Sequence, residues 1–415
     1  MTNFFKLPNE KRLSQLAITT LTNHTIFHFG NSLSLIFLNL YLWRLTNSLC
    51  INGLFNLIAI LSQALVTLSV GKIAKQRDRI TIYRYGILLT ALFYFCILVT
   101  QESIVEYFYL FALLRGVAQS LYWLGYFTLM FEVSNDKNRH RYLGWNQISM
   151  GSANLIGPAA SGAIISMFEG LNGYIVVFTI AFVMFTIATF GSFKMGKMET
   201  HHRQYYMKYL PQIIKRVPSF KNVLLGWFII GFPQGVLMYI PPILLYTILL
   251  EESTVGYLNV IFLLISIISS YVISRLANVD KTREYLVIAA IGFLLSTSVL
   301  FLGITIWTFV FFMAISAVFR PLQANAYAAH YFKWIGVIPL KEHFRVESVV
   351  LRESITNAGR GFGIIIFMLF SREIDETTIP WVLLVVLGMQ WVVPLLVKDQ
   401  IKTEEETNGY KLGTS

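Results

Sequence analysis

Three arginines lie inside long apolar runs of this sequence, where a charged side chain is costly. Arg115 lies in the stretch FALLRGVAQSLYW, and Arg320 and Arg360 lie in two later apolar runs. A guanidinium near the centre of a bilayer costs about 2.5 to 3.5 kcal/mol on insertion scales, so it usually has a function or a built-in partner. No acidic residue lies deep in these runs; Glu132 and Glu353 come closest. The arginines can therefore supply charge-assisted binding of an anion.

Each arginine also has a purely structural interpretation. Arg115 can donate hydrogen bonds to backbone carbonyls or to Gln119, and Arg320 can donate to a carbonyl freed by the proline that follows it. Arg360 lies close to the expected cytoplasmic end of its span, where it can snorkel or pair with Glu353. For Arg360 we favour the structural interpretation, whereas for Arg115 and Arg320 both interpretations remain open.

Arg115 and Arg320 begin similar polar patterns. In both, a tyrosine follows the arginine by seven residues, which is two helical turns along the same face, and a glutamine lies between them. Three further polar residues lie on apolar helical faces elsewhere in the chain. We predict a substrate-binding site from these two sets of side chains: Arg115, Gln119, Tyr122, Arg320, Gln323, Tyr327, Asn154, Gln234 and Asn31.

Few groups in the sequence are placed to carry a coupling proton. His28 shares a helical stripe with His24 and Asn31, and histidine is the side chain that changes charge near neutral pH. The alternative interpretation of His28 is a hydrogen-bonded structural residue. Glu132 and Glu353 are the remaining candidates because they are the acids nearest to the apolar interior.

The composition of the chain is that of a membrane protein. Hydrophobic residues make up 55% and charged residues 13% of its 415 positions, and the mean hydropathy is +0.61; soluble domains contain about 25% charged residues. The sequence contains no phosphate-binding Gly-rich loop, no metal-ligand cluster and no nucleophile elbow. We therefore expect no enzymatic activity, no cofactor and no metal, and we expect transport to draw on a gradient.

Twelve apolar segments are long enough to span a bilayer. Their approximate limits are 17–42, 51–71, 82–100, 107–131, 143–167, 172–193, 222–248, 255–275, 285–303, 307–332, 351–370 and 379–397. The predicted fold class is an all-α membrane protein with two pseudo-symmetric six-helix bundles, residues 1–193 and 222–397. A basic cytoplasmic linker, 194–221, joins them as a tether or short helix on anionic lipid, and residues 398–415 form a cytoplasmic tail.

The basic residues predict the orientation of the chain in the membrane. We set aside the three arginines inside apolar runs and assume a cytoplasmic N-terminus. Every other Lys and Arg, except Arg44 and Arg372, then falls on the cytoplasmic side. This distribution places both termini of a multi-pass cell-membrane protein in the cytoplasm. It also explains the net charge of +11 through contact with anionic lipids, so we expect no nucleic-acid partner.

Twelve spans, a six-plus-six division and a basic central loop resemble the major facilitator superfamily of secondary transporters. The loop GKIAKQRDR resembles the family's G-x-x-x-D-[RK]-x-G-[RK] signature at Gly71 and Arg79, although Lys75 stands at the acidic position and Asp78 at the second glycine. Glu132 and Arg139 resemble the family's E-x6-R pattern, which implies an ion pair between helix ends. The resemblance assigns these residues to a cytoplasmic gate: Gly71, Asp78, Arg79, Glu132 and Arg139.

The fifth segment resembles the Gly-Pro helix of the family's exporters. Gly151, Gly157, Pro158 and Gly162 match that pattern, which implies close helix packing and a bend. Arg115 resembles the segment-four arginine of the same exporters, but the glycine expected after it is displaced to the adjacent position. The stretch LRESITNAGRGFG also resembles poorly characterised permeases of Gram-positive bacteria.

The resemblance implies a monomeric carrier that moves a small solute by alternating access. A proton-linked exporter of small amphipathic compounds is our first interpretation, because of the Gly-Pro helix and Arg115. A carrier or exchanger of a small organic anion is the alternative, because Arg115 and Arg320 are pseudo-symmetric and no deep carboxylate accompanies them. A sensor or scramblase with the same fold has no specific support in the sequence. We expect partners limited to the solute, membrane lipids and protons.

Overall fold

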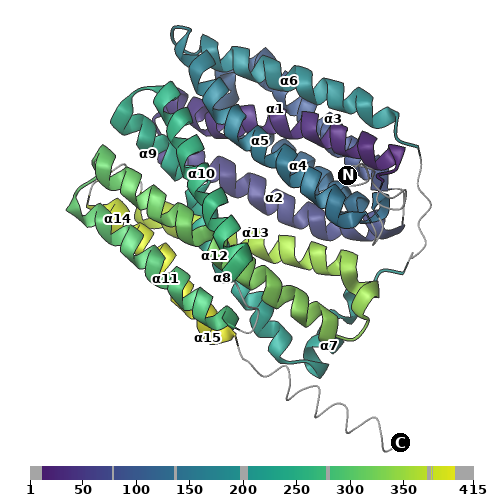
Figure 1. Cartoon of the computed structure of the whole chain (residues 1–415). Helices are drawn as coiled ribbons and strands as arrows, with labels where there is room; N and C mark the ends of the chain where they lie inside the picture. Colours follow the sequence, from purple (N-terminus) through teal and green to yellow (C-terminus); the bar gives the residue numbers. More distant parts are fainter. Residues whose placement is uncertain are drawn as a thin grey trace, which may run out of the picture. The chain divides into compact units, whose positions relative to one another are not determined.

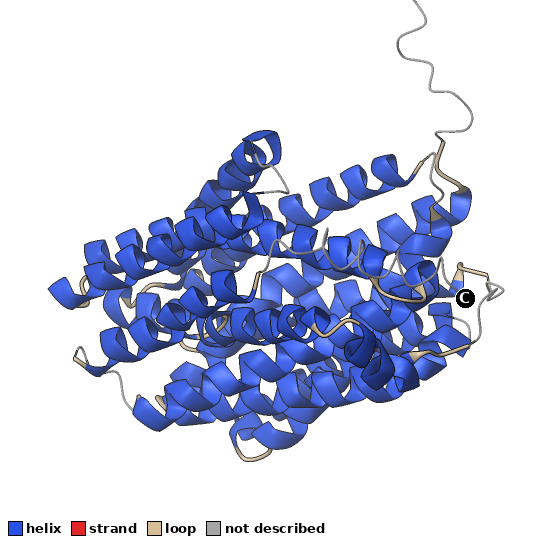
Figure 2. Ribbon diagram, turned by 90° about the horizontal axis from the view of Figure 1, so that it is seen from below, coloured by secondary structure: helices blue, strands red, loops and turns tan. Residues whose placement is uncertain are grey.

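The computed structural model describes residues 12–76, 79–134, 138–196, 204–276, 281–371, 375 and 377–397. All regular secondary structure in these ranges is helical, as Figure 2 shows. The helices are α1 (Gln15–Thr46), α2 (Leu49–Gln76), α3 (Arg79–Thr100), α4 (Phe108–Val133), α5 (Arg139–Ser166), α6 (Asn172–Phe193), α7 (Leu210–Arg216), α8 (Ser219–Leu237), α9 (Ile240–Leu249), α10 (Glu252–Leu276), α11 (Thr282–Ser298), α12 (Ile306–Val337), α13 (Arg345–Phe370), α14 (Thr378–Gly388) and α15 (Val392–Leu396) (Figure 1).

Every predicted apolar segment coincides with a helix or with a pair of consecutive helices. Among the described residues, ten helical stretches are long and apolar enough to cross a membrane. The two other long helices, α4 and α13, have 26 residues each. Each contains an arginine within its apolar run, Arg115 or Arg360, which lowers the hydropathy of the helix. The all-α membrane fold is confirmed, and the count of twelve spans depends on these two polar helices.

The seventh predicted segment is broken in the middle. Helix α8 ends at Leu237 and α9 begins at Ile240, with Pro241 and Pro242 in its first turn. Proline has no backbone N–H and cannot continue the hydrogen-bond ladder of the preceding helix, whereas the first turn of a new helix needs no such donor. The two prolines therefore mark a complete break between two helices.

The chain divides into two compact units, each described here by itself. Unit 1 comprises residues 1–205 and 239–263, and unit 2 comprises 206–238 and 264–415. Helices α9 and the first half of α10 thus pack with the first six helices, although they follow α8 in the sequence. The boundaries of the two six-helix bundles, 1–193 and 222–397, were predicted from the repeat in the sequence, and they remain a prediction.

In unit 1, α1 packs against α5 and α6, and α4 packs against α2 and α3. Small residues allow these close approaches: a Cβ added to Gly157 would lie 2.6 Å from the Ser32 hydroxyl, and one added to Gly162 would lie 2.6 Å from the Glu252 carbonyl. Helix α5 continues through Pro158. Gly151 differs from the other predicted packing residues, because an added Cβ would meet nothing within 4 Å.

In unit 2, α8 and α13 approach each other through glycines. Gly231 and Gly235 of α8, and Gly359 and Gly363 of α13, form two small-xxx-small patterns that lie against the facing backbone. A Cβ at Gly359 would lie 1.9 Å from the Phe228 carbonyl oxygen. No side chain fits there, so the backbones of the two helices are in direct contact.

The linker between the halves packs on unit 2. Ile213 of α7 is buried in an apolar cluster with Phe220, Tyr331 and Trp334, and the backbone N–H of Tyr206 donates to a carboxylate oxygen of Glu347 at 2.7 Å. The apolar face that we expected to lie on lipid therefore lies on protein, since the cluster offers it a larger apolar surface. Residues 197–203 of the predicted linker are outside the described residues.

The glycine contact predicts opposite effects at two glycines. Gly359→Ala should lower the unfolding temperature in dodecylmaltoside micelles, because overpacking typically costs about 1–3 kcal/mol. Gly151→Ala should leave the temperature unchanged or raise it, since alanine favours a helix interior by roughly 0.5–1 kcal/mol over glycine. Equal effects of the two substitutions would contradict the close α8–α13 contact.

The predicted orientation can be tested with a natural cysteine. Cys50 is exposed in the first turn of α2, on the outer side if both termini are cytoplasmic. A membrane-impermeant maleimide should label it in intact cells, and Cys50→Ser should abolish that labelling. A cysteine placed at Lys208 in the Cys50→Ser background should react only after the cells are opened. Labelling of that cysteine from outside would reverse the orientation.

Candidate functional site

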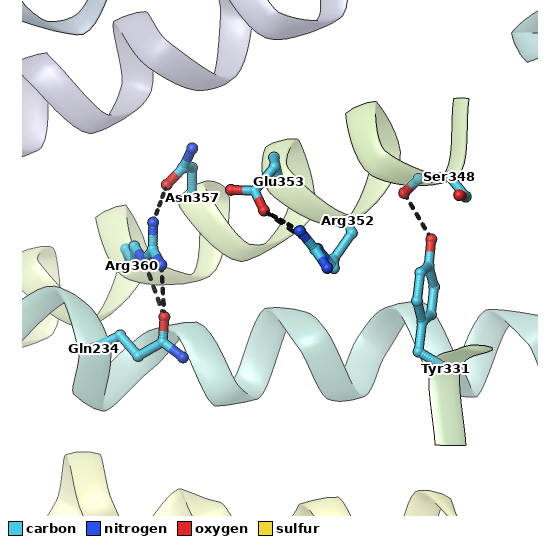
Figure 3. A network of polar contacts seen from close by, with 7 residues as sticks. All are labelled: Gln234, Tyr331, Ser348, Arg352, Glu353, Asn357 and Arg360. Carbon is cyan, nitrogen blue, oxygen red and sulfur yellow. Dashed lines mark hydrogen bonds and ion pairs between the residues drawn. The ribbon is translucent and has the colours of Figure 1, made fainter. Parts of the chain in front are cut away.

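The best-defined polar cluster of unit 2 surrounds Arg360 on α13 (Figure 3). The Arg360 guanidinium donates two hydrogen bonds to the Gln234 side-chain oxygen on α8, at 3.1 and 2.8 Å, and a third to the Asn357 oxygen at 2.7 Å. Both partners are neutral amides. Arg360 does not pair with Glu353 as we expected, and its positive charge is held in the helix pair without a carboxylate.

Glu353 has a different partner. Its carboxylate accepts from the guanidinium of the adjacent Arg352 at 2.7 Å, so this pair is neutral as a whole. Glu353 lies in the third turn of α13, and Arg352 engages its carboxylate.

Arg320 on α12 makes no hydrogen bond or ion pair with any described residue, and its side chain is exposed. The proline that follows it lies inside the helix, and Arg320 does not use the carbonyl that this proline frees. Arg320 and Arg360 both carry a positive charge in unit 2, and an anion bound beside them would lower their mutual repulsion.

Arg115 on α4 is the corresponding residue of unit 1. It is only 8% exposed, and its Nη1 atom has no hydrogen-bond partner. The guanidinium lies 5.5 Å from the centre of the Phe55 ring. Gln119, its possible structural partner, instead accepts from the indole N–H of Trp123 at 2.9 Å. Among the described contacts, Arg115 therefore makes neither of the hydrogen bonds that its structural interpretation requires.

The pseudo-equivalent tyrosines are both fully buried and hold helices together. The Tyr327 hydroxyl donates to the Val223 carbonyl on α8 at 2.8 Å, and the Tyr122 hydroxyl lies 2.5 Å from Nδ1 of His24. Gln323 donates to Gln390 at 2.7 Å. These three predicted binding residues already have partners, because the face of the helix that follows each arginine turns into its bundle.

An aromatic and histidine cluster occupies the core of unit 1. The ring of His24 stacks on Tyr126 and lies 5.7 Å from the ring of His28, one turn further along α1. Nε2 of His28 lies 3.2 Å from the Asn154 side-chain oxygen on α5, while Nδ1 of His28 is buried without a partner. The structure thus brings together two predicted residues, His28 and Asn154. Asn31, on the same helix, is 9% exposed.

The predicted gate residues lie at one end of unit 1. Arg79 at the start of α3 forms an ion pair with Glu132 at the end of α4, and Gly71 is buried nearby in sequence on α2. Glu132 pairs with Arg79 rather than with Arg139, whose guanidinium donates to Ser134. Asp78, the predicted substitute acid of this motif, is outside the described residues.

A second ion pair of unit 1 was missed by sequence reasoning. Arg44 at the end of α1 donates to Glu252 at the start of α10 at 2.7 Å, and the Tyr174 hydroxyl donates to the same carboxylate at 3.0 Å. The only signal for Arg44 in the sequence was its predicted position on the outer side of the membrane, where basic residues are rare. Asn357 was also missed, although its spacing of three residues before Arg360 was a usable signal.

The chemistry of these clusters is that of binding rather than catalysis. Within the described ranges, no group of three or more His, Cys, Asp or Glu side chains is placed to hold a metal ion. The guanidinium groups of Arg115, Arg320 and Arg360 lack carboxylate partners in the part of the chain that is described. Such groups can bind an anion but cannot by themselves break a covalent bond.

The assignment of the buried tyrosines predicts a stability effect. Tyr327→Phe should lower the free energy of unfolding by about 1 kcal/mol, because it leaves a buried carbonyl without its donor. The exposed Tyr257→Phe on α10 is the matched control and should have no effect. Thermal unfolding in detergent micelles measures both, and an unchanged Tyr327→Phe variant would remove the hydroxyl from the helix contact.

Comparisons with known proteins agree with this architecture. The family profile of the Major Facilitator Superfamily matches residues 20–319. The uncharacterized protein YqgE of Bacillus subtilis (strain 168) is 27% identical over 396 residues, which cover 94% of this chain and 90% of YqgE. An uncharacterized protein of Geobacillus stearothermophilus, from the sodM 3' region, is 33% identical over 178 residues, 43% of this chain and 83% of that protein.

Solved structures share the fold at low sequence identity. A bacterial homologue of the iron transporter ferroportin in an inward-facing state superposes with a TM-score of 0.69 at 14% identity, covering 92% of this chain and 97% of that chain. The nucleoside transporter NupG gives a TM-score of 0.68 at 13% identity, covering 92% of this chain and 98% of that chain. The family match over most of the sequence and these transporter-like folds lead to one conclusion: the chain is a membrane protein that belongs to the major facilitator superfamily of transporters.

Proposed function

We propose that this protein is a secondary transporter that carries a small organic anion by alternating access. The observation that carries the proposal is the state of three spanning-helix arginines. Arg115 and Arg320 have no hydrogen-bonding or carboxylate partner among the described residues, and Arg360 has only amides. Family membership supports a transport function, and these arginines support a negatively charged solute.

Other arginines of the chain differ from these three in having carboxylate partners. Arg44 and Arg79 lie near helix ends, and each has a carboxylate partner. The carboxylate removes the net charge locally. An unpaired guanidinium within a spanning helix is unfavourable both when it is buried, as in Arg115, and when it is exposed on the helix surface, as in Arg320. Keeping it requires compensation from water, from lipid headgroups or from a bound anion. A transported anion supplies that compensation during each cycle.

Because the partners of Arg360 are neutral amides, they hold its guanidinium in position without neutralising its charge. Gln234 and Asn357 fix the guanidinium plane from two sides, as Figure 3 shows, but leave its charge unmatched. A fixed guanidinium can bind a carboxylate or phosphate through two parallel hydrogen bonds. We propose that Arg115 and Arg320 contact the anion and that Arg360 adds to the positive potential around Arg320.

The remaining predicted polar residues take supporting roles in this proposal. In unit 1, Asn154 contacts His28, Gln119 lies one turn after Arg115 on α4, and Asn31 follows His28 on α1; in unit 2, Gln234 orients Arg360. Families of this kind bind the solute near the middle of the membrane, where the two halves of the repeat meet. Arg115 and Arg320 occupy corresponding positions in the two halves of the sequence.

Proton-linked export of small amphipathic compounds is the second candidate function. The observation that favours it is His28, whose Nδ1 atom is buried without a partner beside His24. Glu132 and Glu353 are each engaged with an arginine, so His28 is the candidate with a free basic nitrogen. In this mechanism, protonation of His28 would alternate with binding of the solute.

Substitution of the arginines tests the anion proposal. Arg115→Gln and Arg320→Gln should each reduce binding and counterflow of the transported anion by about 10- to 100-fold, because hydrogen bonds to charged groups contribute about 1.5–3 kcal/mol. Arg→Lys should restore only part of the activity, since the charge remains but the two-pronged geometry is lost. The assay is counterflow in proteoliposomes with a panel of radiolabelled carboxylates and phosphate esters.

Arg352→Gln is the matched control for these substitutions. It removes an arginine of the same unit whose charge is already balanced by Glu353, so its effect on anion affinity should be small. Expression and unfolding temperature are measured for every variant to separate binding from folding. A double Arg115→Gln/Arg320→Gln variant that transports anions at the wild-type rate would refute the proposal.

Substitution of His28 separates the two candidate functions. If the protein is a proton-linked exporter, His28→Gln should abolish accumulation against a gradient but retain exchange of solute without a pH gradient. Gln preserves a hydrogen bond to Asn154 and cannot carry the proton. If the protein exchanges anions, both activities should persist. Proton-driven transport that survives neutralisation of His28, Glu132 and Glu353 together would exclude the coupling groups named here.

A further inference from the structure

An apolar pocket lies between α13 and α14, within unit 2. Its volume is about 440 Å³, which falls in the size range of sites for single small molecules and is small for a two-chain phospholipid. Five apolar side chains form most of its wall, and two threonines at the start of α14 complete it: Ile366, Phe370, Trp381, Val382, Val385, Thr377 and Thr378.

The pocket is open on the outside of the helix pair. Phe370 is 66% exposed and Trp381 is 61% exposed, and exposed apolar side chains of spanning helices are the ones that suit contact with lipid tails. The Trp381 ring rests edge-on against Phe301, with ring centres 4.8 Å apart. One side of the indole is therefore fixed by protein, and an apolar tail dissolved in the membrane can reach the pocket.

A carboxylate is held beside the two threonines of the pocket. Asp375 accepts hydrogen bonds from the Thr377 hydroxyl at 2.5 Å and from the Thr378 backbone N–H at 3.0 Å. These bonds lower the pKa of Asp375 to about 2, so the side chain is ionised at neutral pH. It is also exposed, which leaves it accessible to a cation at the mouth of the pocket.

The sequence that contains Asp375 is acidic as a whole. The stretch SREIDETT, from Ser371 to Thr378, contains three acidic residues and one arginine. The predicted orientation places this stretch at the outer face of the membrane. An apolar pocket with a negative rim is complementary to a molecule with an apolar tail and a positive head.

We propose that the pocket between α13 and α14 binds a single-tailed cationic amphiphile, with its tail among Phe370, Trp381 and Val385 and its ammonium group beside Asp375. The site is independent of Arg115 and Arg320, which would repel such a cation. It therefore stands or falls separately from the anion-transport proposal. Its ligand class is an alkyl- or arylammonium compound dissolved in the outer leaflet.

Tryptophan quenching tests the site directly. The purified protein in neutral detergent is titrated with a trimethylammonium surfactant whose alkyl tail is brominated, and with a neutral glucoside of the same tail. The cationic probe should quench the fluorescence at lower concentration than the neutral probe, and Trp381→Phe should remove that saturable component. Val385→Phe, which fills the pocket, should weaken both probes.

Asp375→Asn isolates the charge. Asparagine keeps a side-chain oxygen that can accept the Thr378 backbone N–H, so folding should persist, while affinity for the cationic probe should fall about threefold or more and affinity for the neutral probe should not change. Glu251→Gln is the matched control: this exposed carboxylate also accepts bonds from two nearby hydroxyls, those of Ser253 and Thr254, but it belongs to unit 1 and does not line the α13–α14 pocket.

Three results would overturn the proposal. One is equal affinity for the cationic and neutral probes in the wild-type protein. Another is quenching that persists in Trp381→Phe, which would place the probe elsewhere. The third is an equal loss of cation affinity in Glu251→Gln and Asp375→Asn, which would reduce the effect to general surface charge.

Discussion

The structure depends on one constraint: inside a bilayer, polar and charged groups must find their partners within the protein or at its water-filled surfaces. Backbone groups satisfy it through long helices, and helix ends satisfy it through ion pairs such as Arg44–Glu252 and Arg79–Glu132. Arg115 and Arg320 are exceptions: both lie well inside spanning helices, and neither has a hydrogen-bond or ion-pair partner among the described residues. An exception of this kind is informative, because the cost of keeping it has to be offset by a function.

Close helix contact is the second consequence of that constraint. Lipid tails are as apolar as the side chains of the helices, so burial alone does not drive helices together, and backbone approach must supply van der Waals contact. The glycines of α8 and α13 permit this approach, and it brings Gln234 within hydrogen-bonding distance of Arg360. Packing and the polar cluster are therefore linked: a bulky residue at Gly235 or Gly359 would also displace the amide that orients the guanidinium.

The pocket between α13 and α14 extends the same logic to the lipid-facing surface. There the apolar side chains remain exposed because the bilayer solvates them, and the nearby carboxylate of Asp375 lies beyond the start of α14, where water can solvate it. A positive interior and a negative outer rim can coexist on one chain because they are in different solvents. Each would select a solute of the opposite charge.

The sequence by itself determined the membrane environment, the positions of the helices and the family resemblance, because hydrophobic length and loop charge are local properties that do not require knowledge of neighbours. It also singled out Arg115, Arg320, His28 and Gln234 as candidate functional residues, and their roles remain predictions. It did not identify their partners: Arg360 binds Gln234 and Asn357 instead of Glu353, and Glu132 binds Arg79. The tertiary structure alone decided that Tyr122, Gln323 and Tyr327 turn into their bundles, since which face of a helix is covered depends on helices distant in sequence.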